Sequence, residues 1–444
     1  MRGVPAVVAV LVLSAPSVAG AQERLTLSQA VTGAIERSAG VRAAAAARDR
    51  ASAAADVQHA ALFPQLSWSE SVMRSNQPVF VFGTLLNAGR FASENFAIER
   101  LNQPDAQSAF TSRIAIRQLV FDGGARTGAT DAARYGHDAA TAALDRARAD
   151  VALTVTRAYG QVLTAQAAVA TAEAAVAGAE EDLARATRRR DAGAATDADV
   201  LAIAVQATSL RERGIEAHGQ VAIARAELNR LTGSPIDRPF LVAEPPPGED
   251  APADLQALFA EAEQARPELM ESQAAEAQAR AAQKQARAAW LPVVAAEAGY
   301  ALDGLSFGTR NASWAIGGQV KWDLSLGGAT AASGRAATAA VLAAQAAHAD
   351  ARAAVHVDVV RAVQHLNAAR ARVDLGRDLV TQTRERQRIV RNRYDAGIVS
   401  VNDVLAATTA TVDAEAQRVN ALVDLIVARA ELQRALGRAP VSTP

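Results

Sequence analysis

The sequence contains one distinctive segment twice, and this duplication constrains the fold more than any other feature. RRRDAGAATDADVL ends at Leu201, and NRYDAGIVSVNDVL ends 204 positions later at Leu405. The glycines of the two segments, Gly193 and Gly397, keep this offset, as do two ARAEL segments further along the chain. A repeat of this length that occurs once indicates a single duplication and not a solenoid of many short units.

Both halves contain the same order of predicted elements. Each begins with a helix, from Thr26 to about Leu62 and from about Asp254 to Trp290, followed by a strand, a loop and a second strand. A Gly-Gly pair then precedes a very long helix, the DAG segment and a returning helix. We therefore predict a first structural repeat over residues 22–243, a Pro-rich linker over 244–252 (EPPPGEDAP) and a second repeat over 253–440.

The long helices carry a heptad pattern. Apolar or small residues recur in alternating steps of four and three from Val355 to Tyr394, and the matching positions run from Val151 to Arg190. Such a pattern is typical of helices that pack side by side along their length. Many of these residues are alanine, since the chain is 50% hydrophobic but only 4% aromatic, and alanine permits close approach of helices. A helix over residues 124–191 is roughly 100 Å long, which indicates a rod or a tube.

The duplicated segment has the features of a turn between two helices. Gly193 and Gly397 fit the left-handed position that ends a helix. Thr196 and Ser400 follow three residues later as candidate helix caps, and Asp199 and Asp403 complete a capping box. The chain is therefore expected to reverse direction at the far end of each long helix, once in each half.

The predicted strands alternate between apolar and polar residues. Trp314, Ile316 and Val320 fall on one face of a strand, and Gln319 and Lys321 fall on the other. This pattern is typical of an outer-membrane β-barrel, but an ordinary sheet with one solvated face produces it too. The strands alone leave both interpretations open.

Composition excludes several classes of function. The formal net charge of −1 argues against nucleic-acid binding, and the absence of cysteine excludes disulfides and thiolate sites. His348, His356 and His365 are not spaced to share one helix face, so no metal site is expected. No arrangement of catalytic residues is apparent, and we predict a protein that is not an enzyme and has no cofactor. Arg188-Arg189-Arg190 is interpreted as a solvated or partner-facing patch at a helix end.

The first residues have the features of an export signal. Arg2 precedes an apolar run from Val7 to Leu13, and Ala19-Gly20-Ala21 provides a cleavage motif. We predict a signal peptide over residues 1–21. Beyond the first twenty residues, no stretch is expected to be apolar for long enough to span a membrane as a helix.

The order of elements and two motifs resemble the TolC-type outer membrane efflux protein family. The motifs are QLVFDGG, residues 118–124, and YDAGIVSVNDVL, residues 394–405. The resemblance covers nearly all of the mature chain, in both halves. It implies a mainly α fold with a transmembrane β part: a homotrimer in which each chain gives four strands to a twelve-stranded barrel in the outer membrane of a Gram-negative bacterium, continued by a periplasmic α-helical barrel. The implied function is a passive, gated exit duct of a tripartite efflux or secretion system.

The resemblance also implies partners and site residues. The partners are a periplasmic adaptor (membrane-fusion) protein and an inner-membrane pump such as an RND or ABC transporter. The family docks its adaptor at the two turns, which correspond here to Gly193, Ala194, Ala195, Gly397, Ile398 and Val399. The candidates for a periplasmic gate are Asp403, Tyr394 and Asp199, with Asp199 as the expected hydrogen-bond acceptor of Tyr394. Val399 and Ala406 stand where some family members have a gating arginine and a second acidic residue. Asp403 is therefore either a gate residue or only a helix cap.

The first repeat carries about 24 additional residues between its two strands. They lie between Gln77 and Gln103, and their apolar content suggests a loop that folds against the barrel mouth or a neighbouring chain. The sequence does not identify the exported substrate, which could be a drug, a metal ion or a protein. The alternative function is an exported periplasmic coiled-coil scaffold without channel activity.

Overall fold

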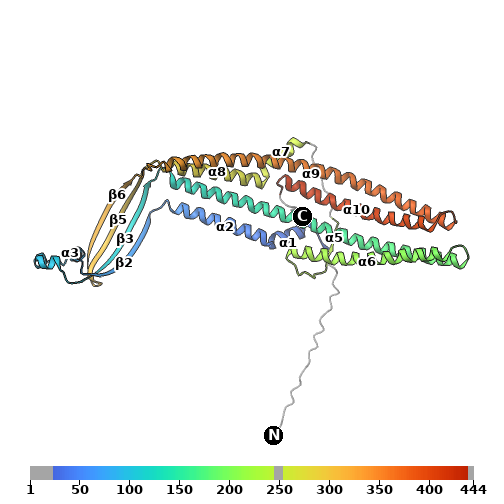
Figure 1. The fold of residues 1–444 in the computed structure, drawn as a ribbon, viewed down its shortest axis with the longest axis horizontal. Coiled ribbons are helices and arrows are strands. Elements are labelled where there is room, and N and C mark those ends of the chain that lie inside the picture. Colours follow the sequence, from blue (N-terminus) through green and yellow to red (C-terminus); the bar gives the residue numbers. More distant parts are fainter. Residues whose placement is uncertain (1–23, 245–253, 439–444) are drawn as a thin grey trace, which may run out of the picture.

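The structure is a computed structural model that describes residues 24–244 and 254–438. It is a long molecule with a β-sheet towards one end and helices running away from it (Figure 1). The predicted signal peptide and all but the first residue of the predicted linker lie outside the described residues.

Two helical hairpins form most of the length. The long helices α5 (Ala125–Asp191) and α9 (Ala329–Asp395) have 67 residues each, and they pack against the returning helices α6 (Asp197–Thr232) and α10 (Val401–Ala435). Each long helix therefore extends roughly 100 Å, as predicted. The duplication predicted from the sequence is confirmed.

The predicted heptad positions form the buried face of α9. Its buried residues include nine of the predicted positions: Val355, Val359, Ala362, Leu366, Ala369, Val373, Gly376, Val380 and Tyr394. Small residues bring the helices close together. A Cβ atom placed on Gly376 would lie 3.2 Å from the Cα of Arg418 on α10, which leaves little space for any side chain there.

The first helix of each repeat is broken, and the prediction of one continuous helix in each was wrong. The segments are α1 (Leu27–Arg37), α2 (Ala39–Ala60), α7 (Leu255–Ala265) and α8 (Pro267–Ala288). Ser38 interrupts the first pair with ψ 126°, and its hydroxyl accepts a hydrogen bond from the backbone N–H of Val41. Pro267 interrupts the second pair, because proline disfavours helical geometry at the residue before it. Arg266 accordingly has extended backbone, with ψ 122°.

A pair of two-residue strands near the middle of the molecule was not predicted. Strand β1 (Arg24–Leu25) runs parallel to β4 (Leu241–Val242). The hydroxyl of Tyr159 on α5 donates to the carbonyl oxygen of Ala243 at 2.6 Å and lies 2.9 Å from that of Leu25, and the N–H of Ala243 contacts the same hydroxyl at 3.0 Å. Tyr159 is fully buried, so this hydroxyl joins the pair of strands to the helical core.

The four remaining strands form one antiparallel sheet in the order β2-β3-β5-β6. Their bounds are β2 (Gln65–Ser75), β3 (Gln107–Phe121), β5 (Val293–Ser306) and β6 (Thr309–Lys321). Each repeat contributes two adjacent strands. Within the described residues, β2 and β6 each have one edge without a partner strand.

The register of the sheet separates an apolar face from a polar face. Trp68, Ile114, Tyr300 and Trp314 lie side by side in one row across all four strands. The row one residue away consists of Ser69, Arg113, Ala301 and Ser313, on the opposite face. The predicted alternation is confirmed, and the apolar row is exposed in the single chain, with Trp314 75% exposed.

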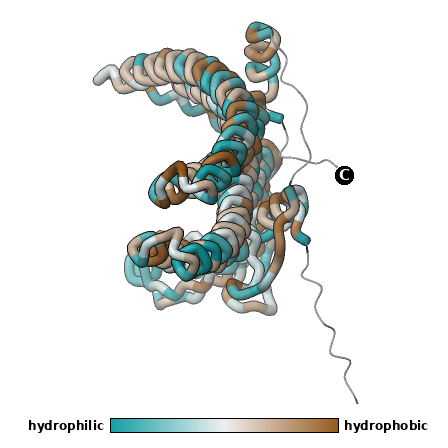
Figure 2. The backbone as a smooth tube through the Cα atoms, turned by 90° about the vertical axis from the view of Figure 1, so that its right-hand side faces the viewer, coloured by the Kyte–Doolittle hydropathy of each residue, from teal (hydrophilic) through white to brown (hydrophobic). Residues whose placement is uncertain are grey.

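The helices are arranged as a curved wall. Viewed from the end, they lie in an arc that is open on one side, instead of surrounding a central core (Figure 2). Packing between elements is correspondingly lateral: α5 contacts α2, α6, α8 and α10. Of the described helices, α5 alone contains a window long and apolar enough to cross a membrane by length and composition. The expectation that no helix beyond the first twenty residues would be apolar enough to span a membrane was therefore wrong by this criterion. The alanines of α5 count as apolar in such a window, although each adds little apolar surface.

The additional residues of the first repeat form a folded connection between β2 and β3. They contain α3 (Pro78–Asn87), a short 3-10 helix (Ser93–Phe96) and α4 (Ile98–Asn102). Helix α3 lies at the end of the sheet that is far from the helical hairpins (Figure 1).

Candidate functional site at the hairpin tips

The two turns have the same backbone geometry. Gly193 and Gly397 both have φ of 74°, in the left-handed region where a Cβ atom causes strain. The N–H groups of Ala194 and Ile398 donate to carbonyl oxygens five residues earlier, at 2.8 and 2.9 Å. This pattern satisfies carbonyl groups at the helix C-terminus and fixes the direction in which the chain leaves. The predicted turns are confirmed in both repeats.

Asp199 and Asp403 cap the returning helices, as the capping motif predicts. The carboxylate of Asp199 accepts from the N–H and the hydroxyl of Thr196 at 3.0 and 2.8 Å. That of Asp403 accepts from the N–H and the hydroxyl of Ser400 at 2.9 and 2.7 Å. These hydrogen bonds lower the pKa of both aspartates below the usual carboxyl value. Both side chains are therefore ionised at neutral pH.

Tyr394 is part of a small apolar cluster between the two hairpins. The cluster joins Ala186 of α5, Ile203 of α6 and Val401 and Val404 of α10, and Tyr394 is only 9% exposed. Burial raises the pKa of Tyr394, and the negative charge of Asp199 raises it further. Among the described residues, no partner forms a hydrogen bond with the Tyr394 hydroxyl. The expected bond to Asp199 is not formed in this structure, where the Asp199 carboxylate accepts hydrogen bonds from Thr196.

Arginine side chains connect the tip of the first hairpin to the second. The guanidinium of Arg189 lies over the Tyr394 ring, 4.8 Å from its centroid, and donates to the Tyr394 carbonyl oxygen. Arg185 forms an ion pair with Asp395 at 3.0 Å. Arg189 is therefore not simply solvated, as its position in the Arg188–Arg190 run suggested. The sequence held one signal that the two tips differ. Arg189 corresponds to Arg393 of the second repeat, but Arg190 corresponds to Tyr394, so the second repeat has an aromatic ring where the first has a cation.

The predicted docking residues differ in accessibility. Gly193, Ala194, Gly397 and Ile398 are exposed, and Ile398 is 72% exposed. Ala195 and Val399 are half-buried, and Val399 packs against the apolar cluster around Tyr394. The accessible part of each tip is therefore the glycine and the residue next to it.

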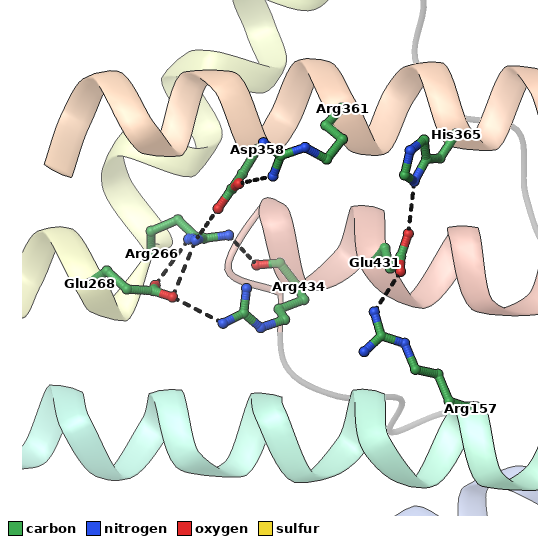
Figure 3. A network of polar contacts seen from close by, with 8 residues as sticks. All are labelled: Arg157, Arg266, Glu268, Asp358, Arg361, His365, Glu431 and Arg434. Carbon is green, nitrogen blue, oxygen red and sulfur yellow. Dashed lines mark hydrogen bonds and ion pairs between the residues drawn. The ribbon is translucent and has the colours of Figure 1, made fainter. Parts of the chain in front are cut away.

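A second polar network involves residues of α5, of the start of α8, of α9 and of α10 (Figure 3). The Arg266 side chain is only 3% exposed, and it contacts Glu268 at 3.0 Å, Asp358 at 3.2 Å and the carbonyl oxygen of Arg434 at 3.2 Å. It thereby connects the start of α8 to α9 and α10. Glu431 of α10 pairs with Arg157 of α5 at 2.7 Å.

The three histidines considered in the sequence have separate partners. His348 contacts the hydroxyl of Ser272 at 2.8 Å, His356 contacts Glu263 at 2.7 Å, and His365 contacts Glu431 at 3.3 Å. In residues 24–244 and 254–438, no group of three histidine, aspartate or glutamate side chains gathers in a way that could hold a metal ion.

Comparison with known families identifies the chain. The model of the outer membrane efflux protein family matches residues 30–234 and 258–438, once in each repeat. The chain belongs to this family. It is an outer membrane efflux channel protein with a periplasmic helical domain and not an enzyme. A sequence search of curated proteins found no significant match.

Solved structures share the fold over nearly the whole chain. A membrane protein from Pseudomonas aeruginosa is 22% identical, with a TM-score of 0.79 and 93% of each chain covered. The CmeC outer membrane channel of Campylobacter jejuni is 17% identical, with a TM-score of 0.79 over 93% of this chain and 85% of that one. VceC from Vibrio cholerae is 20% identical, with a TM-score of 0.78 over 93% and 96%. The predicted fold class is confirmed.

Proposed function

We propose that three copies of this chain form one continuous duct, with a twelve-stranded barrel in the outer membrane and a helical tube in the periplasm. The sheet carries the proposal, because it has an apolar face, a polar face and two unpaired edges. Lipid cannot satisfy the backbone groups of an open edge, so the edges must pair with those of other copies. Three copies of four strands give an even number within the range known for such barrels.

The curved helical wall supports the same assembly. An arc of laterally packed helices becomes a closed tube when copies are added side by side (Figure 2). The polar face of the sheet would then line the duct, and the row that contains Trp68 and Trp314 would face lipid. In this proposal residues 1–21 are removed as a signal peptide, and the two repeats keep the boundaries 22–243 and 253–440.

The hairpin tips would form the periplasmic end of the duct and its gate. Tyr394, Asp199 and Asp403 stand at this end, and Arg189 holds the two hairpins of one chain together. The buried hydroxyl of Tyr394 lacks a partner in the single chain, which supports a rearrangement or a neighbouring chain that supplies one. Opening would separate the hairpins at their tips, and the duct itself supplies no energy.

The exposed tip residues would dock a periplasmic adaptor protein, which connects the duct to an inner-membrane pump such as an RND or ABC transporter. Gly193, Ala194, Gly397 and Ile398 offer small or apolar exposed surface at the very end of the molecule. In this proposal the pump chooses the substrate, and the duct serves as its exit.

Detergent extraction tests the assembly directly. The protein is expected in the outer-membrane fraction, with a protein mass of three chains, and to conduct ions in planar bilayers. A soluble monomer without conductance would instead support an exported coiled-coil scaffold.

The gate has its own test. Asp403→Ala is expected to change conductance or its block by cations while the yield of trimer stays the same. A lower yield of trimer with the same conductance per trimer would show that Asp403 is only a helix cap.

A further inference from the structure

The two strand connections at the far end of the sheet differ greatly in size. Strands β5 and β6 are joined by Phe307 and Gly308 alone, whereas β2 and β3 are joined by a connection that contains α3, the 3-10 helix and α4. We call residues 78–102 of this connection the mouth segment. A turn of two residues is enough to join two antiparallel strands, so the mouth segment needs another explanation.

The mouth segment folds into a compact unit. The ring of Phe91 contacts the rings of Phe82 and Phe96 edge to face, with centroids 4.8 and 5.0 Å apart. Val81 is 5% exposed. Aromatic contacts of this geometry stabilise a local fold, so the segment is an ordered element and not a loose loop.

The mouth segment is attached to the polar face of the sheet. The side-chain amide of Asn311 donates to the carbonyl oxygen of Asn87 at 3.1 Å, and Gly89 approaches the same side chain. Asn311 pairs with Asp303, which pairs with Thr111, in a row of the polar face close to the β5–β6 turn. The segment therefore lies at the outer end of the sheet on the side that lines the proposed duct.

Large apolar side chains of the mouth segment remain uncovered in the single chain. Val79 is 79% exposed, Phe96 is 63% exposed and Ile98 is 76% exposed. Lipid covers the opposite face of the sheet in the proposed assembly, so it does not account for apolar residues attached to the polar face. In the proposed trimer the same segment of the two other copies would cover them, because the polar faces of all three sheets would point towards one axis.

The dimensions fit this occupant. Twelve strands about 4.8 Å apart, tilted by about 40°, close a barrel roughly 24 Å across. A helix with its side chains is about 10 Å wide. Three mouth segments therefore suffice to cover the opening.

We propose that the mouth segments of three copies meet through Val79, Phe96 and Ile98 and form an apolar lid over the outer mouth of the duct. This inference rests on the proposed trimer. The lid would be a second closure at the end opposite to the hairpin tips, and it would exclude bulky external solutes until cargo displaces it.

Labelling from outside intact cells tests the lid without opening the periplasmic gate. The chain has no cysteine, so Ser313→Cys places a single thiol on the polar face, inside the mouth. A polymer-linked maleimide that cannot cross membranes should label it slowly in the parent, and rapidly when residues 79–101 are replaced by a short Gly-Ser turn. Gly308→Cys in the β5–β6 turn should be labelled rapidly in both forms.

Point substitutions guard against misfolding of the shortened chain. Val79→Ser combined with Ile98→Ser should speed labelling of Ser313→Cys by about tenfold, because polar side chains at these positions weaken the apolar contact between the copies. A tenfold change corresponds to about 1.4 kcal/mol. Val57→Ser, at a 66% exposed position of α2, should leave the rate unchanged. Equal labelling in all forms of a conducting trimer would overturn the lid and leave the proposed function intact. Failure to obtain a trimer from the parent chain would overturn both.

Discussion

The two repeats share their backbone but differ in the polar contacts that hold them in place. Their long helices have the same length, and their turns have the same geometry. Their core positions also match: Val155 and Val162 of the first repeat correspond to Val359 and Leu366 of the second, and all four are buried. The duplicated part is thus the hairpin with its apolar face.

Away from the turns, several polar side chains differ between the repeats. Ser38 and Arg266 occupy matching breaks between helices, yet one forms a simple cap and the other a buried ion network. Tyr159 fixes a pair of short strands, whereas the matching residue in the second repeat is Val363. The two repeats therefore share helix length and turn geometry, while several polar contacts between neighbouring elements differ between them.

The largest difference in stability between matching positions of the two repeats is expected at the helix breaks, Ser38 and Arg266. Arg266→Ala should lower the free energy of unfolding by about 3 kcal/mol, because it leaves Glu268 and Asp358 without their buried cation. Ser38→Ala should cost only about 1 kcal/mol, as for other helix caps. Denaturant unfolding followed by circular dichroism measures both. Arg361→Ala is the matched control, since Arg361 also pairs with Asp358 but is 60% exposed. Equal effects of Arg266→Ala and Arg361→Ala would contradict the ranking.

The second largest loss of stability is expected at Tyr159, which has no tyrosine counterpart in the second repeat. Tyr159→Phe removes a buried hydroxyl and leaves the carbonyl oxygen of Ala243 without its donor, at a cost of about 2 kcal/mol. The N–H of Ala243 keeps its contact with the carbonyl oxygen of Leu25 at 3.4 Å. Tyr135→Phe, on the same helix but partly exposed, should change stability little.

The same residue makes stability depend on pH at the alkaline end. Burial raises the pKa of Tyr159 to about 12, from an ordinary value of 10.0. The neutral form is therefore favoured by folding, so its contribution is complete below pH 10 and is lost as the pH rises through about 12. The stability gap between the parent and Tyr159→Phe should narrow over this interval. A constant gap would show that the hydroxyl does not titrate in the folded chain.

At the tips, Arg189 and Arg393 occupy matching positions but differ in their contacts. Arg189→Ala removes the cation over the Tyr394 ring, and should cost about 1 kcal/mol or less. It should also raise the conductance of the trimer, because the two hairpins separate more easily. Arg393→Ala, at an exposed position, should leave the conductance of planar bilayers unchanged. If both variants conduct alike, Arg189 does not hold the hairpins together.

The smallest effect is expected at the two capping aspartates, Asp199 and Asp403, where the repeats should behave alike. The pKa values of Asp199 and Asp403 are lower in the folded chain than the ordinary carboxyl value of 3.8. The stabilisation that each aspartate gives its helix is therefore complete above pH 3.8, and it is lost as the pH falls through the lower pKa of the folded chain. Asp199→Asn and Asp403→Asn should therefore speed amide exchange in the first turns of α6 and α10 to a similar extent at neutral pH. The difference from the parent should disappear at acid pH. Unequal effects would show that one aspartate has a role beyond capping.

The sequence predicted the features that depend on local pattern. The heptads, the capping motifs, the left-handed glycines and the alternating strands each follow from residue spacing, and the structure contains all of them. The breaks at Ser38 and Arg266 were missed, although Pro267 is a recognisable helix boundary. The contacts of Arg189 with Tyr394 and of Tyr159 with the short strands could not be predicted, because they join residues more than 80 positions apart whose pairing depends on how the helices are placed side by side.

The equal length of α5 and α9 has a consequence for any change in the tube. Both helices begin directly after a Gly-Gly pair that follows the sheet, and both end at a turn, so in a trimer all six turns would stand at one level. Removing a single residue from one long helix would draw three of the six turns back by about 1.5 Å and rotate the rest of its apolar stripe by about 100°. Length can therefore change only in both helices together, and by whole heptads, if the rim is to stay even and the stripes are to keep facing their neighbours.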